Sequence, residues 1–236
     1  MANSFFHFKQ FTVNQERSAF KVGTDGVLLG ACADIAGVKS ILDIGTGTGL
    51  IALMLAQRSG AIITAVEPDP GSFLQACVNA SQSKWAERIT VVNSSLQDYN
   101  PAGIEFDLIV TNPPWFTGSL KNPDAGKAAA RHDIALNYND LLAGVSRLLA
   151  VKGKFQVILP CKEAAIFAVK AREHGLYCNN RLKIKPLPQA AVKRLILTFS
   201  WHEVNITERS LIIENGKRHE FTEEYKELTR DFYLNF

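Results

Sequence analysis

The chain has 236 residues, a formal net charge of +3 and 47% hydrophobic residues. A chain of this length can bury roughly three quarters of its unfolded surface in one core, which predicts a single domain over residues 1–236. The N-terminus has no signal-peptide pattern and no apolar stretch is long enough for a membrane span, so we expect a cytoplasmic protein. The four cysteines show no metal-ligand spacing with the five histidines. We therefore expect buried thiols and no metal.

A glycine-rich loop follows the first predicted buried strand, residues 40–42. The loop is Asp43-Ile44-Gly45-Thr46-Gly47-Thr48-Gly49, and the apolar residues 50–56 after it predict a helix. Strand, loop and helix in this order bring a ligand close to backbone amides at a helix N-terminus. The third glycine comes one position earlier than in the dinucleotide fingerprint, which argues against a pyrophosphate cofactor. The alternative for a lone glycine cluster is a tight surface turn.

The next predicted strand, residues 61–66, ends at an acidic residue. This residue, Glu67, follows Asp43 by 24 positions, the spacing at which a carboxylate reaches the ribose hydroxyls of a bound nucleotide. Asp43 precedes the glycines, where it would repel a phosphate but attract a cation. S-adenosylmethionine carries an ammonium, a sulfonium and a ribose. The two acidic residues and the loop between them therefore predict this molecule as the cofactor.

A short polar motif, Asn112-Pro113-Pro114-Trp115, follows the predicted buried strand at residues 106–111. A proline donates no N–H, so carbonyls beside the two prolines are expected to lack a local partner and to act as acceptors. The Asn112 amide adds another acceptor and Trp115 adds a flat face. Together they predict a catalytic pocket that stacks on a planar group and accepts hydrogen bonds from its NH₂. The alternative is an ordinary turn, since Asn-Pro often begins one.

The remaining elements first alternate and then change their pattern. Residues 136–149 and 162–174 predict helices on either side of a buried strand at residues 155–159. Residues 176–184 and 195–201 then predict two successive strands with no helix between them. Asn215-Gly216 is a hairpin signal, and a short helix is expected from Thr222 onward.

The positive charge is concentrated in the second half of the chain. Residues 1–120 contain 7 basic and 10 acidic residues, a net charge of −3, whereas residues 121–236 contain 19 and 13, a net charge of +6. Several cations flank the segment 186–188, which predicts a contact with a phosphate backbone. The alternative is the solvated face of a strand. The cations are Arg181, Lys183, Lys185, Lys193 and Arg194.

These motifs resemble those of a known family. The glycine loop with its leading Asp43, Glu67 and the Asn-Pro-Pro-aromatic motif are similar to those of Rossmann-like methyltransferases that act on planar amines. Residues 8–11 and 21–30 resemble the bacterial valine-tRNA adenine-N6-methyltransferases, and the resemblance continues through residues 52–58 and Arg131-His132. Trp115 departs from the family's usual Tyr. Lys84 stands where a Pro is expected.

The resemblance implies the fold and the activity. The expected fold is a class I methyltransferase α/β domain, with a mostly parallel seven-stranded sheet, an antiparallel edge hairpin and helices on both faces. Residues 1–35 would close the cofactor site, and residues 202–236 would form a C-terminal hairpin and helix extension. The expected reaction is N6-methylation of adenosine 37 in a valine tRNA by a monomer. Methylation of a protein glutamine, methylation of guanine N2 in rRNA and a noncatalytic RNA-binding scaffold are the alternatives.

The resemblance also implies further site residues. Lys21, Thr24 and Asp98 would join the acids and glycines at the cofactor, with Asp98 near the adenine amine. The alternative for Asp98 is a loop residue. Arg131 and His132 would contact the RNA or close over the site, or they would only cap the following element.

Overall fold

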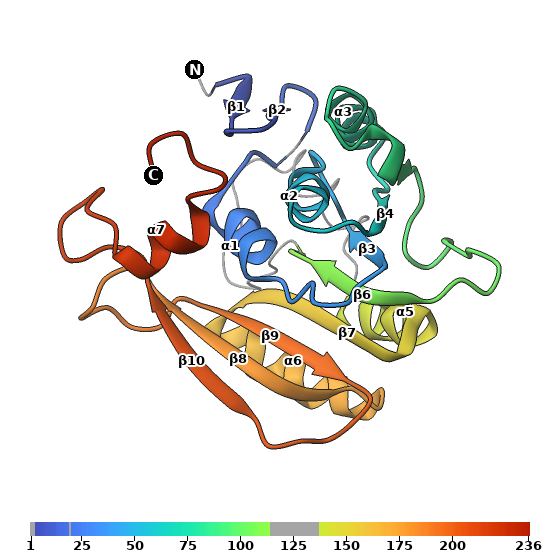
Figure 1. Cartoon of the computed structure of the whole chain (residues 1–236). Helices are drawn as coiled ribbons and strands as arrows, with labels where there is room; N and C mark the ends of the chain where they lie inside the picture. The colour runs from blue at the N-terminus through green and yellow to red at the C-terminus, as the bar shows by residue number, and fades with distance from the viewer. Residues whose placement is uncertain (1–2, 19, 114–136) are drawn as a thin grey trace, which may run out of the picture.

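A computed structural model describes residues 3–18, 20–113 and 137–236, and within them the chain forms an eight-stranded sheet (Figure 1). The strand β9 is antiparallel to both of its neighbours, and the other pairs in this sheet are parallel. The strand order reverses between β3 and β6, which is where an open α/β sheet binds its ligand. In spatial order the strands are β10 (Thr207–Ile212), β8 (Tyr177–Lys185), β9 (Arg194–Ser200), β7 (Leu149–Pro160), β6 (Phe106–Thr111), β3 (Ser40–Ile44), β4 (Ile62–Val66) and β5 (Ile89–Val92).

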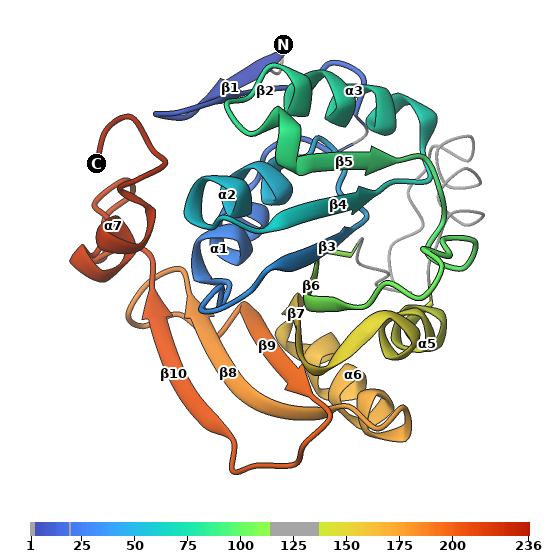
Figure 2. The same ribbon diagram turned by 45° about the vertical axis from the view of Figure 1, so that its right-hand side comes forward.

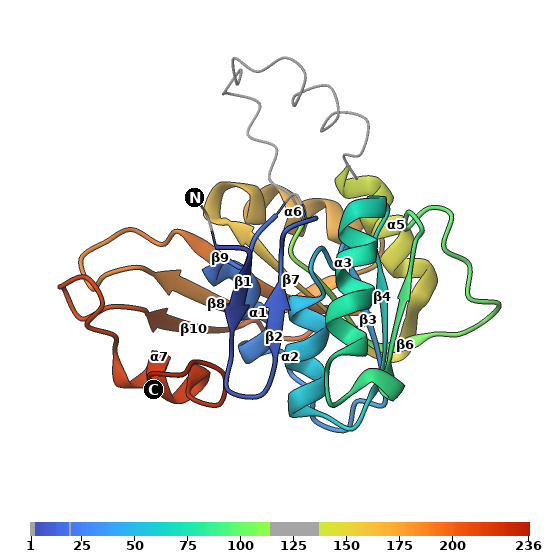
Figure 3. The ribbon, with the colours of Figure 1, turned by 90° about the horizontal axis from the view of Figure 1, so that it is seen from above.

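Helices cover both faces of the sheet (Figures 2 and 3). One face is covered by α1 (Thr24–Cys32), α2 (Leu50–Arg58) and α3 (Pro70–Ser81), and the other by α5 (Tyr138–Leu148) and α6 (Cys161–Glu173). The 3₁₀ turn η1 (Ala86–Arg88) precedes β5, and α7 (Glu223–Thr229) packs against α1 and β10. Because strand side chains alternate, consecutive residues of β7 enter different cores. Ile158 lies in the core under α1 and α2, whereas Val157 lies in the core under α5 and α6.

The two end segments of the chain lie against each other. The strands β1 (Phe5–His7) and β2 (Thr12–Asn14) form a separate two-stranded sheet near α3, and the residues that join them contact the segment after α7. Phe8 stacks on Tyr233 with ring centroids 5.9 Å apart. The ammonium of Lys9 donates to the carbonyls of Arg230 and Phe236 at 2.5 and 2.6 Å, respectively. The N-terminal segment is therefore anchored by residues more than two hundred positions away.

The expected class of fold is confirmed, but its sheet has an additional strand. We expected seven strands with an edge hairpin; β10 pairs in parallel with β8, so the hairpin of β8 and β9 is not at the edge. The sequence of residues 207–212 does not predict a strand, because four of its six residues are polar and are exposed in the structure. The Asn215-Gly216 signal also differs from a tight hairpin. It lies in a loop closed by a bridge between Glu214 and Phe221.

The prediction that all four cysteines are buried is wrong. Cys161 is exposed at the start of α6, and Cys32, Cys77 and Cys178 are half-buried. All four are free thiols. Burial raises the pKa of the Cys32 thiol to about 12, so this thiol stays protonated at neutral pH.

Phe155 provides a test of the core under α5 and α6. Its ring is fully buried, 5.8 Å from the ring of Phe199 and 6.1 Å from that of Phe167. We expect Phe155→Ala to lower the free energy of unfolding by about 3–5 kcal/mol, because the change leaves a cavity between these rings. Val151→Ala is the control in the same strand, since Val151 is 69% exposed. Urea denaturation should show a large loss only for the first variant; equal losses would contradict the packing described.

Candidate active site

The glycine loop leaves β3 in a conformation that L side chains rarely adopt. Gly45, Gly47 and Gly49 have φ angles of 67°, 58° and 81°, in the left-handed region. The amides of Gly45 and Thr46 donate to the carbonyl of Val66 at 2.9 and 3.1 Å, which ties the loop to the end of β4. A Cβ on Gly45 would meet no atom within 4 Å. The loop therefore presents bare backbone beside open space, as a cradle for a ligand does.

Asp43 holds this loop from beneath. Its side chain is fully buried, and its Oδ2 accepts from the Thr46 hydroxyl at 2.5 Å and from the amide of Ala52 at 3.2 Å. Ala52 is in the first turn of α2, so the carboxylate acts as a cap for that helix. Among the described atoms, Oδ1 is buried with no hydrogen-bond partner. Burial raises the pKa of Asp43 to about 7, although the hydrogen bonds from Thr46 and Ala52 act to lower it.

Glu67 lies at the end of β4 on the other side of the loop. Its Oε2 accepts from the amide of Gly47 at 2.8 Å and its Oε1 accepts from the amide of Asp69 at 3.0 Å. Glu67 is 7% exposed, and burial raises its pKa. A carboxylate has about four lone-pair positions, so two remain for a ligand.

The end of β6 brings Asn112 to this loop. The register pairs Ile44 with Thr111, and the Thr111 hydroxyl donates to the carbonyl of Ile44 at 2.9 Å. The next residue of each strand therefore leaves the sheet at the same edge: Gly45 from β3 and Asn112 from β6. A Cβ on Gly26 of α1 would be 4.0 Å from Nδ2 of Asn112. Pro113 is buried. Pro114 and Trp115 lie outside the described residues, as do Arg131 and His132.

The N-terminal segment reaches the glycine loop through a residue that the sequence analysis missed. Asn79 of α3 is 1% exposed, and its amide NH₂ donates to the carbonyls of Asn14 and Thr48, both at 2.8 Å. Its oxygen accepts from the amide of Asn14 at 2.9 Å. An asparagine inside a helix gives no sequence signal for such a bridge, which depends on tertiary structure. Asn79 thus joins the N-terminal segment, α3 and the loop.

Two of the residues expected at the cofactor, Lys21 and Thr24, are exposed. Lys21 donates to the carbonyl of Asn3 at 3.3 Å, and Thr24 is the first residue of α1. Asp98 is exposed six residues beyond the end of β5, where its carboxylate accepts from the Ser95 hydroxyl at 2.6 Å. This turn also agrees with the reading of Asp98 as a loop residue. The roles of all three toward a cofactor stay predictions.

Most basic residues on and beside β8 and β9 form ion pairs or hydrogen bonds with other residues of the chain. Lys183 and Arg181 both pair with Glu208, at 2.6 and 3.4 Å. Lys185 donates to the carbonyl of Pro188 at 2.5 Å. Arg194 pairs with Asp25 of α1 at 2.8 Å. Lys193 is exposed. The predicted footprint for a phosphate backbone is therefore weaker on this strand pair than its count of cations implies.

The geometry fits S-adenosylmethionine, as the sequence predicts. The Cβ-free cradle at Gly45, the free lone pairs of Glu67 and the buried unpartnered oxygen of Asp43 would suit a cationic nucleoside better than a phosphate. Across the described ranges, no group of three or more His, Cys, Asp or Glu residues could hold a metal ion. No helix in the same ranges is long and apolar enough to cross a membrane.

Comparison with known proteins identifies the family of the chain. Residues 17–158 match the family model of the methyltransferase small domain. The chain is 46% identical to a tRNA1(Val) (adenine(37)-N6)-methyltransferase of Bacteroides thetaiotaomicron over 100% of this chain and 99% of that protein. It is 44% identical to the protein of the same name from Trichodesmium erythraeum, and both chains are covered in full.

Solved structures support the fold alone. A crystal structure from Agrobacterium tumefaciens, described as a predicted O-methyltransferase, aligns with a TM-score of 0.68 at 20% identity. The alignment covers 88% of this chain and 96% of that one. The sequence identity over the full length and the matched domain show that the chain belongs to the tRNA1(Val) (adenine(37)-N6)-methyltransferase family.

Proposed function

We propose that this protein transfers a methyl group from S-adenosylmethionine to N6 of adenosine 37 in a valine tRNA. The observation that carries the proposal is the register of β3 and β6, which brings Asn112 and the glycine loop to one edge of the sheet. The names of the full-length relatives describe the same reaction. Since tRNA is the substrate, we place the protein in the cytoplasm, where we expect it to act as a monomer.

Asn112 and Pro113 align the reacting amine. The adenine N6 is a poor nucleophile because its lone pair is delocalised into the ring. If the Asn112 amide oxygen and the Pro113 carbonyl accept both N6 hydrogens, the nitrogen becomes tetrahedral and its lone pair becomes available. Positioning then provides most of the rate acceleration. The bond from the methyl group to the sulfonium would break as the N6–methyl bond forms, and the methylated nitrogen would then lose one proton to water, so no side-chain base is needed. Pro114 and Trp115 complete this clamp in the proposal, with Trp115 stacking on the base.

The cofactor supplies an electrophilic methyl group on its sulfonium. We assign Glu67 to the ribose hydroxyls, the loop of Gly45, Gly47 and Gly49 to close backbone approach, and Asp43 to the positive charge of the bound molecule. Asp43 is fully buried, so it acts through the loop and by its charge. Lys21, Thr24 and Asp98 complete the assignment.

The N-terminal segment, residues 1–35, closes over this site in the proposal. The Asn79 bridge supports this assignment because it ties Asn14 to Thr48 of the glycine loop. Ser18 supports it too: a Cβ on Gly47 would be 3.9 Å from its hydroxyl. Residues 202–236 form an extension of the same domain that anchors this segment through Lys9. Arg131 and His132 are assigned to the RNA.

The clamp is tested by Asn112→Ala. We expect the formation of N6-methyladenosine in valine tRNA to collapse while S-adenosylmethionine still binds, because the lost contact aligns only the amine. Nucleoside mass spectrometry measures the product and calorimetry measures cofactor binding. Asn205→Ala, an exposed amide change, is the control and should leave both unchanged. Near-normal product from Asn112→Ala would refute the clamp. Methylation of a protein glutamine instead of tRNA would replace the proposed substrate.

The ribose contact is tested by Glu67→Ala. Charge-assisted hydrogen bonds are among the stronger polar contacts, so we expect the affinity for S-adenosylmethionine to fall about tenfold or more. The exposed Glu87→Ala is the matched control with the same change in charge. Calorimetric titration measures the affinity of both variants for S-adenosylmethionine. Equal affinities would contradict the assignment of Glu67 to the ribose.

The elevated pKa of Asp43 predicts a dependence of cofactor binding on pH. Because a nearby cation favours the ionised carboxylate, binding should lower this pKa and release a proton at pH values below about 7. The affinity for S-adenosylmethionine should therefore rise from about pH 5.5 to about pH 7.5. The dependence should disappear in Asp43→Asn. Calorimetry in buffers of different ionisation enthalpy measures the proton release directly, and a release that persists in Asp43→Asn would assign it to another group.

A further inference from the structure

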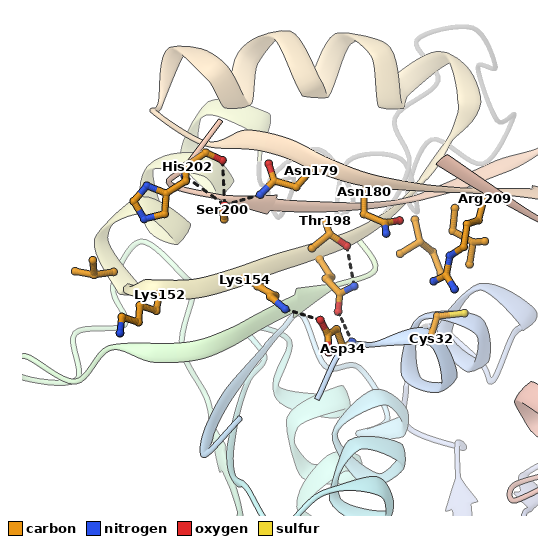
Figure 4. A pocket seen from close by; sticks show the side chains of 14 residues that line it. Cys32, Asp34, Lys152, Lys154, Asn179, Asn180, Thr198, Ser200, His202 and Arg209 are labelled. Carbon is orange, nitrogen blue, oxygen red and sulfur yellow. Dashed lines mark hydrogen bonds and ion pairs between the residues drawn. The ribbon is translucent and has the colours of Figure 1, made fainter. Parts of the chain in front are cut away.

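A polar groove lies on the sheet face that carries α1, far from the glycine loop. It has a volume of about 600 Å³ and is lined by β7, β8, β9 and β10 together with the residues after α1 (Figure 4). Asn112 follows Thr111, which pairs with Val157 of β7. Lys152 of the groove is six residues before Ile158 on the same strand, roughly 15–20 Å from the level of Asn112 at about 3.3 Å per residue. Arg209, at the other end of the groove, is level with Ile158 through Leu182 and Ile196, but β10 lies four strands away from β6, about 19 Å at roughly 4.8 Å per strand. The groove is therefore separate from the proposed active site.

The groove forms because the side chains on this face of the sheet change from apolar to polar where α1 ends. Near the catalytic edge this face presents Ile158, Ile184 and Ile196, which are buried in the core under α1 and α2. Alternation keeps Lys154 and Thr198 on the same face, but α1 ends at Cys32 and no longer covers them. A face meant for another helix would continue with apolar residues. The polar side chains here indicate a ligand that forms hydrogen bonds.

The charges of the groove favour an anion. Among the described residues that line it, the only acidic side chain is that of Asp34, which is paired with Lys154 at 2.5 Å. Lys152 and Arg209 are exposed, and within the described ranges their side chains have no hydrogen-bond or ion-pair partner. Figure 4 shows Lys152 and Arg209 toward opposite ends of the groove, with Asn180 and Thr198 between them. Two cations that border a row of amide and hydroxyl groups suit an extended anion with several oxygens.

We infer that this groove binds the sugar-phosphate backbone of the tRNA, several nucleotides away from the methylated adenosine. Lys152 and Arg209 neutralise phosphates, and the amide and hydroxyl groups bond to phosphate or ribose oxygens. The inference rests on the proposed function. It also relocates the RNA contact. Arg181 and Lys183 share Glu208 and therefore offer less net charge than Lys152 and Arg209.

The double variant Lys152→Gln/Arg209→Gln tests the inference. We expect the KM for tRNA to rise about tenfold, and the slope of log binding constant against log salt to fall by about 1.4–1.8, because two phosphate contacts are lost. The kcat at saturating tRNA and the affinity for S-adenosylmethionine should stay unchanged, since the groove touches neither reacting group. Each single variant should give about half of the change in slope.

Lys217→Gln/Arg218→Gln is the matched control. It removes the same charge from the exposed loop between β10 and α7 and should leave the KM and the salt slope at the wild-type values. If the wild type methylates tRNA but the groove variant keeps its KM and salt slope, the inference is wrong and the proposed function stands. An equal loss in both double variants would also overturn it, because nonspecific charge would explain the effect. A wild-type protein that makes no N6-methyladenosine would instead refute the proposed function.

Discussion

The register between β3 and β6 is the constraint on which the site depends. It pairs Asp43 with Val110 and Ile44 with Thr111, so the glycine loop and Asn112 leave the sheet side by side. A shift of one residue would turn the buried side chains of one strand to the opposite face. Both faces are covered by apolar cores, so a shift in register would cost much of the free energy of folding. The register is therefore strongly specified. The energy of the two cores thus fixes the distance between the glycine loop and Asn112.

A second constraint is the burial of negative charge beneath the loop. Asp43 and Glu67 together accept three backbone amides, from Ala52, Gly47 and Asp69, and so shape the loop before any ligand arrives. Burial opposes their ionisation, which raises the pKa of both groups. For Asp43, this destabilises the protein as the pH rises from the ordinary carboxyl pKa of 3.8 through about 7, since the unfolded state releases its proton first. A cation bound beside the loop would offset this cost.

The local motifs could be predicted from sequence, whereas their tertiary partners could not. The glycine loop, Glu67 and Asn112 follow buried strands, and short-range patterns reveal both the strands and their ends. Asn79 could not be found, because its three hydrogen bonds join positions 31 and 65 residues away. The neutralisation of Lys183 was equally invisible, since it depends on β10 lying beside β8. The groove required knowing where α1 stops covering the sheet.

The contact between the two ends of the chain also orders the events of biosynthesis. Lys9 leaves the ribosome early, but the carbonyl of Arg230 is made 221 residues later. At about 5–20 residues per second, the N-terminal segment waits roughly 10–45 s for this partner. During this interval the glycine loop and the central strands can already form, while the N-terminal segment lacks its anchor at Arg230. The segment around Lys9 is therefore fixed in place only after Arg230 has been made, although it is synthesised 221 residues earlier.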